Sequence, residues 1–225
     1  MAEFDKKRKQ LVTRLEKNGY IKSKSVKEAM LNVPRELFVP VTGQKYAYTD
    51  SPLSTFDGQT ISAPHMNAMM CEILDLSPGQ KVLEIGTGSG YHGALCAYIV
   101  GKTGDPEHQG HLYTIERNQK LCDFARDNFD HAGFSDIITI IHGDGTNGYP
   151  EEAPYDRILV TAAGPEVPKP LIEQLADKGI LCIPVGADRG SQKLLVITKI
   201  GDKVRQKSVG RVVFVPLIGD HGFSQ

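Results

Sequence analysis

The chain has 225 residues, of which 40% are apolar and 24% charged, as is ordinary for a globular protein. Its 26 Lys and Arg against 27 Asp and Glu give a formal net charge of −1, so no overall field attracts nucleic acid or an anionic membrane. No stretch reaches the roughly 18 apolar residues of a membrane span, and no signal-like apolar run follows the N-terminus. We therefore expect a soluble, cytoplasmic, monomeric protein.

The four cysteines are widely spaced and form no CxxC pair. Their apolar neighbours, as in Leu95-Cys96-Ala97, indicate small core residues. Disulfides or a metal site are the less favoured alternatives, and a reducing compartment fits such cysteines best.

The first third of the chain predicts helices followed by a loop. An apolar stripe at helical spacing ends at Gly19, and Ser25 with Glu28 three residues on forms a capping box for a second helix over 26–32. Residues 40–60 are rich in Gly, Pro, Thr, Asp and Ser, which predicts an ordered loop.

From residue 81 onward, short strands alternate with helices. Strands are predicted at 81–85, 111–115, 137–141, 157–160 and 180–185, and helices at 90–100, 118–132 and near 168–176. Continuous branched apolar runs of this kind indicate a parallel sheet buried on both faces. Two later strands, 194–200 and 209–215, have no helix between them and predict an antiparallel pair. The predicted fold class is α/β, a doubly wound and mostly parallel sheet with N-terminal helices and a C-terminal antiparallel strand pair.

A glycine-rich turn over residues 84–90 (EIGTGSG) links the first strand of the sheet to the next helix. Glycines at the carboxyl end of a parallel strand let the backbone approach a ligand closely. Gly88, Gly90 and Gly93 also satisfy the GxGxxG dinucleotide fingerprint, so an NAD-type site is an alternative. The carboxylate of Glu84 would repel a pyrophosphate but would suit a positive amino group and a sulfonium, which favours S-adenosylmethionine.

Two further carboxylates follow the next two strands. Glu116 can accept hydrogen bonds from ribose hydroxyls. Asp144 can accept from an exocyclic adenine amine while the N–H of Gly145 donates to the ring. Each acid taken alone could be an ordinary loop acid or helix cap. Acids at three consecutive strand ends form a more specific signature for S-adenosylmethionine.

The segment after the fourth strand, 161–166 (TAAGPE), lacks the Asn/Asp-Pro-Pro-aromatic loop of enzymes that methylate amines in nucleic acids. A carboxylate acceptor is already ionised at neutral pH and needs orientation and partial desolvation, not a strong base.

Segments spread over nearly the whole chain resemble the protein-L-isoaspartate O-methyltransferase family. The matching stretches are 57–65, 82–90, 143–145 with 148–149, 153–156, 160–170 and 214–217. The resemblance implies methyl transfer from S-adenosyl-L-methionine to the free carboxylate of L-isoaspartyl residues in damaged proteins and peptides, which initiates their repair and yields S-adenosyl-L-homocysteine. The chain departs from the family pattern in an insertion at 103–109 and in its tail, 219–225.

The resemblance also assigns site residues. Ser62 with Thr60 would be catalytic, although Ser62 could instead only cap the helix over 66–74. The cofactor-binding set is Glu84, Gly86, Thr87, Gly88, Gly90, Glu116, Arg117, Asp144, Gly145 and His65. The substrate-binding set is Gln59, Ile61, Val215, Pro216 and Leu217. For His65 a capping or core role, and for 214–217 an ordinary strand, are equal alternatives. No metal site is expected.

One domain is expected over 1–225, with a helical and loop part at 1–78 that covers the substrate, a cofactor-binding core at 79–190 and C-terminal strands at 191–225. The expected partners are isoaspartyl proteins and peptides, with neither nucleic acid nor membrane. The rival functions are an S-adenosylmethionine enzyme acting on a small molecule or RNA, an NAD-binding oxidoreductase, and a silent module that binds isomerised segments.

Overall fold

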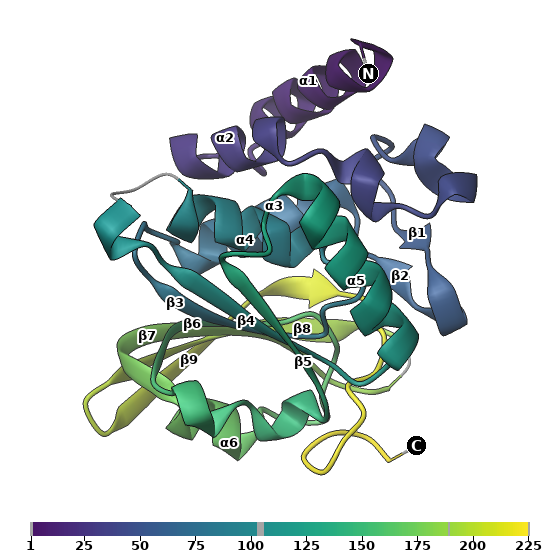
Figure 1. Cartoon of the computed structure of the whole chain (residues 1–225). Coiled ribbons are helices and arrows are strands. Elements are labelled where there is room, and N and C mark those ends of the chain that lie inside the picture. The colour runs from purple at the N-terminus through teal and green to yellow at the C-terminus, as the bar shows by residue number, and fades with distance from the viewer. Residues whose placement is uncertain (1, 103–105, 189, 225) are drawn as a thin grey trace.

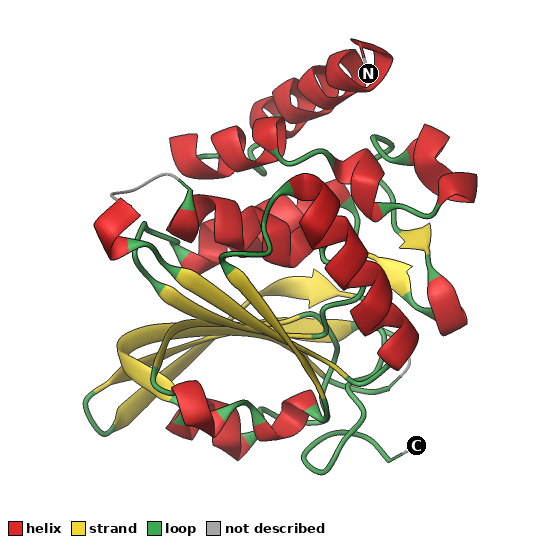
Figure 2. Ribbon diagram, in the orientation of Figure 1, coloured by secondary structure: helices red, strands yellow, loops and turns green. Residues whose placement is uncertain are grey.

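The computed structural model describes residues 2–102, 106–188 and 190–224. Within these residues a seven-stranded sheet runs in the order β5-β4-β3-β6-β7-β8-β9 (Figures 1 and 2). The strands are β3 (Lys81–Ile85), β4 (His111–Glu116), β5 (Ile138–His142), β6 (Tyr155–Val160), β7 (Leu175–Val185), β8 (Gln192–Ile200) and β9 (Lys203–Val212). The first five strands in this order, β5-β4-β3-β6-β7, pair in parallel, whereas β8 pairs antiparallel with both β7 and β9. The predicted fold class is therefore confirmed, and β3 has neighbours on both sides, which places its carboxyl end at the switch point.

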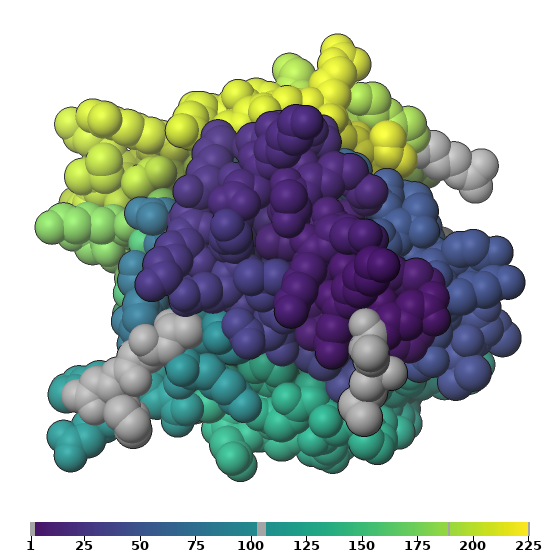
Figure 3. Space-filling view, turned by 90° about the horizontal axis from the view of Figure 1, so that it is seen from above, coloured from purple at the N-terminus to yellow at the C-terminus, as the bar shows by residue number. Residues whose placement is uncertain are grey.

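The two faces of the sheet are covered unequally (Figure 2). One face carries α3 (Pro64–Leu74), α4 (Tyr91–Gly101) and α5 (Gln119–Ala132), with α1 (Ala2–Lys17) and α2 (Lys24–Asn32) stacked above them. The other face carries the short α6 (Lys169–Glu173) and the 3-10 helices η5 (Gly145–Asn147) and η6 (Pro150–Glu152). Seen from above, the N-terminal residues lie over the centre of the molecule (Figure 3).

The inner strands of the sheet send alternate side chains into two different cores. Val82 and Leu159 join the cluster under the helical face, whereas their neighbours Leu83 and Ile158 join the cluster on the opposite face. All four are fully buried. Burial on both faces explains why the sequence runs are continuously apolar instead of alternating.

The start of α2 differs from the predicted capping box. The side chain of Ser23, not Ser25, accepts from the Val26 N–H at 3.2 Å. The Ser23 hydroxyl and N–H also donate to the Glu72 carboxylate of α3. This contact with a distant helix selects Ser23 as the cap, and local spacing could not reveal it.

The predicted boundaries near the C-terminus are also wrong. The chain turns from helix to strand at residue 175, so the helix expected near 168–176 ends at Glu173. Strand β9 ends at Val212, three residues before the predicted end of the 209–215 strand. Nearly all of β9 is exposed at the sheet edge, so it carries few apolar residues and the sequence signal for it is weak.

Helix α5 begins and ends as predicted. The side chain of Asn118 accepts from the Lys120 N–H, and Gly133 closes the helix in the left-handed region with φ 73°. Of the insertion at 103–109, residues 103–105 lie outside the described residues. Among the helices that are described, none has the length and apolar character needed to cross a membrane.

Candidate active site

The glycine turn after β3 bends through three left-handed residues. Gly86, Gly88 and Gly90 have φ values of 93°, 56° and 90°, which side chains rarely adopt. A Cβ at Gly86 would collide with the Thr161 hydroxyl, and one at Gly90 would lie 2.7 Å from the Phe129 ring. A Cβ at Gly88 would meet no atom within 4 Å. The outer glycines therefore let neighbouring elements pack closely, and the middle glycine leaves open space.

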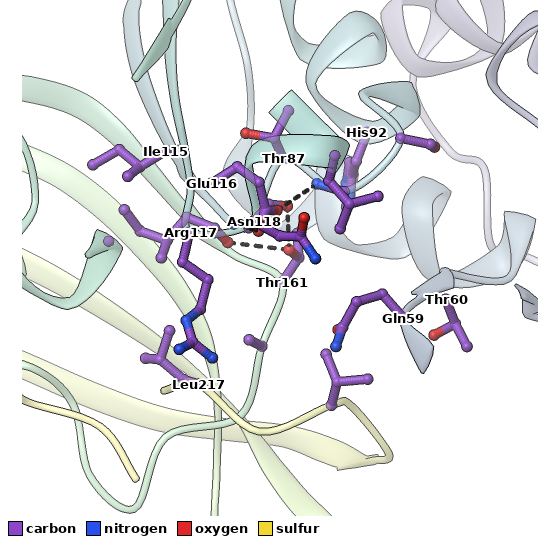
Figure 4. A pocket seen from close by; sticks show the side chains of 18 of the residues that line it. Gln59, Thr60, Thr87, His92, Ile115, Glu116, Arg117, Asn118, Thr161 and Leu217 are labelled. Atoms are coloured by element: carbon purple, nitrogen blue, oxygen red, sulfur yellow. Dashed lines mark hydrogen bonds between the residues drawn. The ribbon is translucent and has the colours of Figure 1, made fainter. Parts of the chain in front are cut away.

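Glu116 at the end of β4 holds this turn in place. Its buried carboxylate accepts from the Gly88 N–H through Oε2 and from the Asn118 N–H through Oε1, both at 3.0 Å. Each oxygen keeps a further lone pair for a ligand hydroxyl. Figure 4 shows Glu116 and Asn118 at the centre of the site, with Arg117 extending away from Glu116.

A cleft of about 510 Å³ opens at this edge of the sheet. Most of the site residues expected from the sequence line it. They are Gln59, Thr60, Ile61, Ser62, Gly86, Thr87, Gly88, Glu116, Arg117, Gly145, Val215, Pro216 and Leu217. Gln59 and Thr60 come from a segment separate from the strand ends, as Figure 4 shows. Glu84, Gly90, His65 and Asp144 do not line the cleft.

Ser62 presents a free hydroxyl to the cleft. The N-terminal cap of α3 is Ala63, without a side-chain hydrogen bond, so the alternative that Ser62 caps this helix is wrong. Within the described residues the Ser62 hydroxyl has no partner, while its carbonyl accepts from Arg35 at 2.8 Å. The guanidinium of Arg35 is fully buried and also donates to the Ala47 carbonyl and to Asn67 Oδ1.

His65 faces away from the cleft. Its Nδ1 and its backbone N–H both lie 2.9 Å from Asp50 Oδ1. Asp50 therefore satisfies a donor at the start of α3, where a helix N-terminus favours an anion. His65 does not line the cleft, and its role in cofactor binding stays a prediction.

Glu84 lies behind the cleft instead of in it. It is fully buried, and burial raises the pKa of its carboxyl to about 7. Its Oε2 accepts from the Thr114 hydroxyl at 2.7 Å, which is 2.7 Å from the hydroxyl of Thr87 in the cleft wall. In this structure Glu84 therefore connects with the cleft through two hydroxyls, and its role in cofactor binding stays a prediction.

Asp144 is engaged by the C-terminal tail. Its carboxylate accepts from the Asp220 N–H at 2.7 Å and from the Thr146 N–H and hydroxyl at 2.8 and 2.7 Å. Burial alone would raise the pKa of Asp144, and these hydrogen bonds outweigh burial and lower it. A Cβ at Gly219 would overlap the carboxylate. Asp144 lines a neighbouring cavity with the tail residues 219, 223 and 224, so the tail occupies the place where we expected an adenine amine.

The segment 215–217 is attached to the loop after β6. The Ala163 N–H donates to the Val215 carbonyl, and the Leu217 N–H donates to the Ala163 carbonyl, both at 2.8 Å. In the same loop the Thr161 hydroxyl donates to the Gly86 carbonyl at 2.7 Å. One loop thus connects 215–217 with the glycine turn.

The segment that carries Gln59 and Thr60 is fixed by a contact with α5. Asp57, at φ 52°, accepts from Asn118 Nδ2 at 2.8 Å and from Lys120 Nζ at 3.2 Å. Two short strands, β1 (Leu53–Ser54) and β2 (Thr60–Ile61), pair antiparallel within it.

Several residues of the cleft were not predicted as site residues from the sequence. Asn118 was expected only at the start of a helix, and Thr161 and His92 were not singled out, although all three line the cleft. Thr161 directly follows a parallel strand, so the rule that ligands bind at carboxyl ends of strands could have found it. Nothing in the sequence marks His92.

A mostly parallel sheet that ends in an antiparallel strand pair, with a glycine turn at its switch point, is the fold of S-adenosylmethionine-dependent methyltransferases. The model of the protein-L-isoaspartate(D-aspartate) O-methyltransferase family matches residues 6–222. The chain is 54% identical to the protein-L-isoaspartate O-methyltransferase of Hyperthermus butylicus, over 99% of this chain and 92% of that one, and 51% identical to that of Staphylothermus marinus, over 99% and 98%.

A solved Plasmodium falciparum chain gives the same result for the fold. Named as a protein-L-isoaspartate O-methyltransferase and solved with S-adenosyl-L-homocysteine, it superposes with a TM-score of 0.82 at 30% identity, covering 94% of this chain and 98% of that one. The chain belongs to the protein-L-isoaspartate(D-aspartate) O-methyltransferase family.

Proposed function

We propose that this chain transfers a methyl group from S-adenosyl-L-methionine to the free carboxylate of L-isoaspartyl residues in proteins and peptides, giving the methyl ester and S-adenosyl-L-homocysteine. The observation that carries the proposal is the meeting of two walls in one cleft. The donor wall consists of residues 86–89 and 116. The acceptor wall consists of residues 59–62 and 215–217. Membership of the family supports both the cofactor and the acceptor.

The donor wall fits S-adenosylmethionine. The open space over Gly88 admits a ligand against the backbone, and the remaining lone pairs of Glu116 suit the two ribose hydroxyls. We assign Gly86, Thr87, Gly88, Glu116, Arg117 and Gly145 to cofactor binding. Gly90 would act through packing on α5, and Glu84 through the hydroxyls of Thr114 and Thr87. Asp144 could contribute its carboxylate only when the tail releases one of its oxygens.

The acceptor wall fits a carboxylate. The cofactor supplies a methyl group on a positive sulfonium, which becomes a neutral thioether when a carboxylate oxygen takes the methyl carbon. The Ser62 hydroxyl can donate a hydrogen bond to the acceptor and orient it, with Thr60 beside it. Gln59, Ile61 and the segment 215–217 would hold the peptide and exclude water. No proton has to be removed from the acceptor, because a carboxylate is already ionised at neutral pH.

The ester product explains a role in protein repair. An isoaspartyl methyl ester closes to a succinimide more readily than the free acid does, because a methoxide equivalent leaves more easily than hydroxide. We also propose a cytoplasmic location and action as a monomer. The four cysteines are free thiols, which favours a reducing compartment.

The experiment that tests this function measures transfer of labelled methyl from S-adenosylmethionine to two peptides that differ only in L-isoaspartate or aspartate. We expect base-labile label in the isoaspartyl peptide alone. Ser62→Ala should lower the transfer rate and leave cofactor binding intact, whereas Glu116→Gln should weaken cofactor binding. Lys203→Gln, on the exposed edge of the sheet, serves as the matched control.

Equal labelling of both peptides, or label that resists base, would reject the carboxyl acceptor. Tight cofactor binding without any transfer would leave a binding module. Transfer to RNA or to a small molecule in place of either peptide would reject the acceptor but retain the donor wall. A change in absorbance with NAD would point to the dinucleotide alternative.

A further inference from the structure

A buried cluster of three metal-ligand residues lies directly behind the cleft. Cys71 comes from α3, and His92 and Cys96 come from α4. One ligand atom from each of the three residues lies within 4.8 Å of the other two. His92 and Cys96 are four residues apart, so the helix places them on one face, opposite Cys71.

The cluster contains polar atoms that lack the partners their burial requires. Neither ring nitrogen of His92 has a hydrogen-bond partner within the described residues, and the side chain is almost fully buried. The Oε1 atom of the neighbouring Glu84 is likewise buried without a partner. A buried polar atom without a partner destabilises the fold, so such atoms call for a water or an ion.

We propose that Cys71, His92 and Cys96 bind one Zn²⁺ ion. Two thiolates and an imidazole are soft and borderline donors, which suit zinc and disfavour magnesium and calcium. Tetrahedral Zn–S bonds of about 2.3 Å place two sulfurs about 3.8 Å apart, which lies within the 4.8 Å that separates the ligand atoms of the cluster at most.

Such an ion would join the two walls of the cleft. Helix α3 begins two residues after Ser62 of the acceptor wall, and α4 begins directly after the glycine turn of the donor wall. His92 itself lines the cleft (Figure 4). A zinc ion between the two helices would fix the spacing of the walls. The site is defined by its ligands alone and does not depend on the proposed methyl acceptor.

The test titrates Co²⁺, and then Zn²⁺, into the full chain kept reduced by a non-thiol reductant. We expect one Co²⁺ per chain, with a thiolate-to-cobalt charge-transfer band and intense tetrahedral d–d bands that Zn²⁺ abolishes. Zn²⁺ should also raise the melting temperature. Cys71→Ser, Cys96→Ser and His92→Gln should each weaken Zn²⁺ binding by more than the roughly 10–100-fold that loss of an outer-sphere partner costs.

Cys122→Ser and Cys182→Ser are matched controls, because both remove a buried thiol outside the cluster. Circular dichroism and cofactor binding establish that each variant is folded. If folded, reduced wild-type protein shows no thiolate charge-transfer band, the zinc site is rejected whatever the variants do. Equal binding by Cys71→Ser and Cys182→Ser would reject it too. The zinc site is also rejected if the reduced chain binds no metal and a Cys71–Cys96 disulfide forms in air. The two cysteines would then be a redox pair.

Discussion

The donor and acceptor walls of the cleft are built in different ways. The donor wall rests on regular elements: a strand end, a glycine turn and a helix cap, tied by backbone N–H groups to Glu116. The acceptor wall is irregular, and side chains from distant segments hold it, chiefly Arg35 under Ser62 and the Asn118 contact to Asp57. Local sequence thus determines the structure of the donor wall, and tertiary contacts determine that of the acceptor wall. Variants can test the two walls separately.

The largest effect is expected from Arg35→Met. This change leaves the buried acceptors Ala47, Asn67 and Ser62 without their donor. We expect the free energy of unfolding to fall by roughly 3–5 kcal/mol, since each lost partner costs about 1–3 kcal/mol and the terms are not additive. Denaturant unfolding measures the loss. The exposed Arg205→Met in β9 is the control, and equal losses would contradict the role of Arg35.

Gly86→Ala alters the glycine turn of the donor wall. The added Cβ meets the Thr161 hydroxyl at a positive φ, which costs about 1–2 kcal/mol for the backbone and about 1–3 kcal/mol for overpacking. Calorimetry should show cofactor binding weakened at least tenfold. Gly19→Ala, at φ +77° with open space around it, carries the backbone strain without the collision. If both variants bind cofactor alike, the turn does not contact the ligand.

Asp57→Ala loosens the acceptor wall without touching the donor wall. It removes the contacts from Asn118 and Lys120, and we expect the KM for peptide to rise a few-fold while cofactor affinity stays constant. A double-mutant cycle with Asn118→Ala isolates the pair. Additive effects of the two changes would show that the contact does not position the loop.

The smallest effect concerns the tail. In Gly219→Ala the new Cβ overlaps the Asp144 carboxylate and expels the tail from it. If Asp144 serves the cofactor, its freed oxygens should tighten S-adenosylmethionine binding a few-fold in a direct binding assay. Gly143→Ala in the same loop meets no atom within 4 Å and is the control. Weaker binding by Gly219→Ala would instead make the tail a part of the site.

The sequence predicted the sheet well because its strands are buried on both faces. The run 158–160 is apolar throughout, and 81–85 is apolar except for Lys81 and Glu84, so both stand out from a surface segment. The same reasoning failed for β9, whose exposed edge position imposes no apolar pattern. The glycine turn and Glu116 were found for a related reason, since the end of a recognisable strand fixes where they lie.

Three predicted site residues do not line the cleft, and one physical cause accounts for all three. His65, Glu84 and Asp144 are polar, and each pairs with a group far away in the sequence or across the sheet: Asp50, Thr114 and the backbone of Asp220 respectively. Spacing along the chain gives the type of a residue and its element. It does not give the partner that a folded neighbour supplies. The resemblance to the family predicted the acceptor segments 59–62 and 215–217, which propensity alone does not mark.

Asn118 belongs to both halves of the site at once. Its N–H binds Glu116, its side-chain oxygen caps α5, and its side-chain nitrogen binds Asp57. A ligand that hydrogen-bonds to Glu116 therefore affects Asn118, which also anchors the loop around Gln59 and Thr60. By thermodynamic linkage, if the bound nucleoside changes the affinity for the peptide by some factor, the bound peptide changes the affinity for the nucleoside by the same factor. Under the proposed function, Asn118 is therefore the residue through which binding of one substrate would change the affinity for the other.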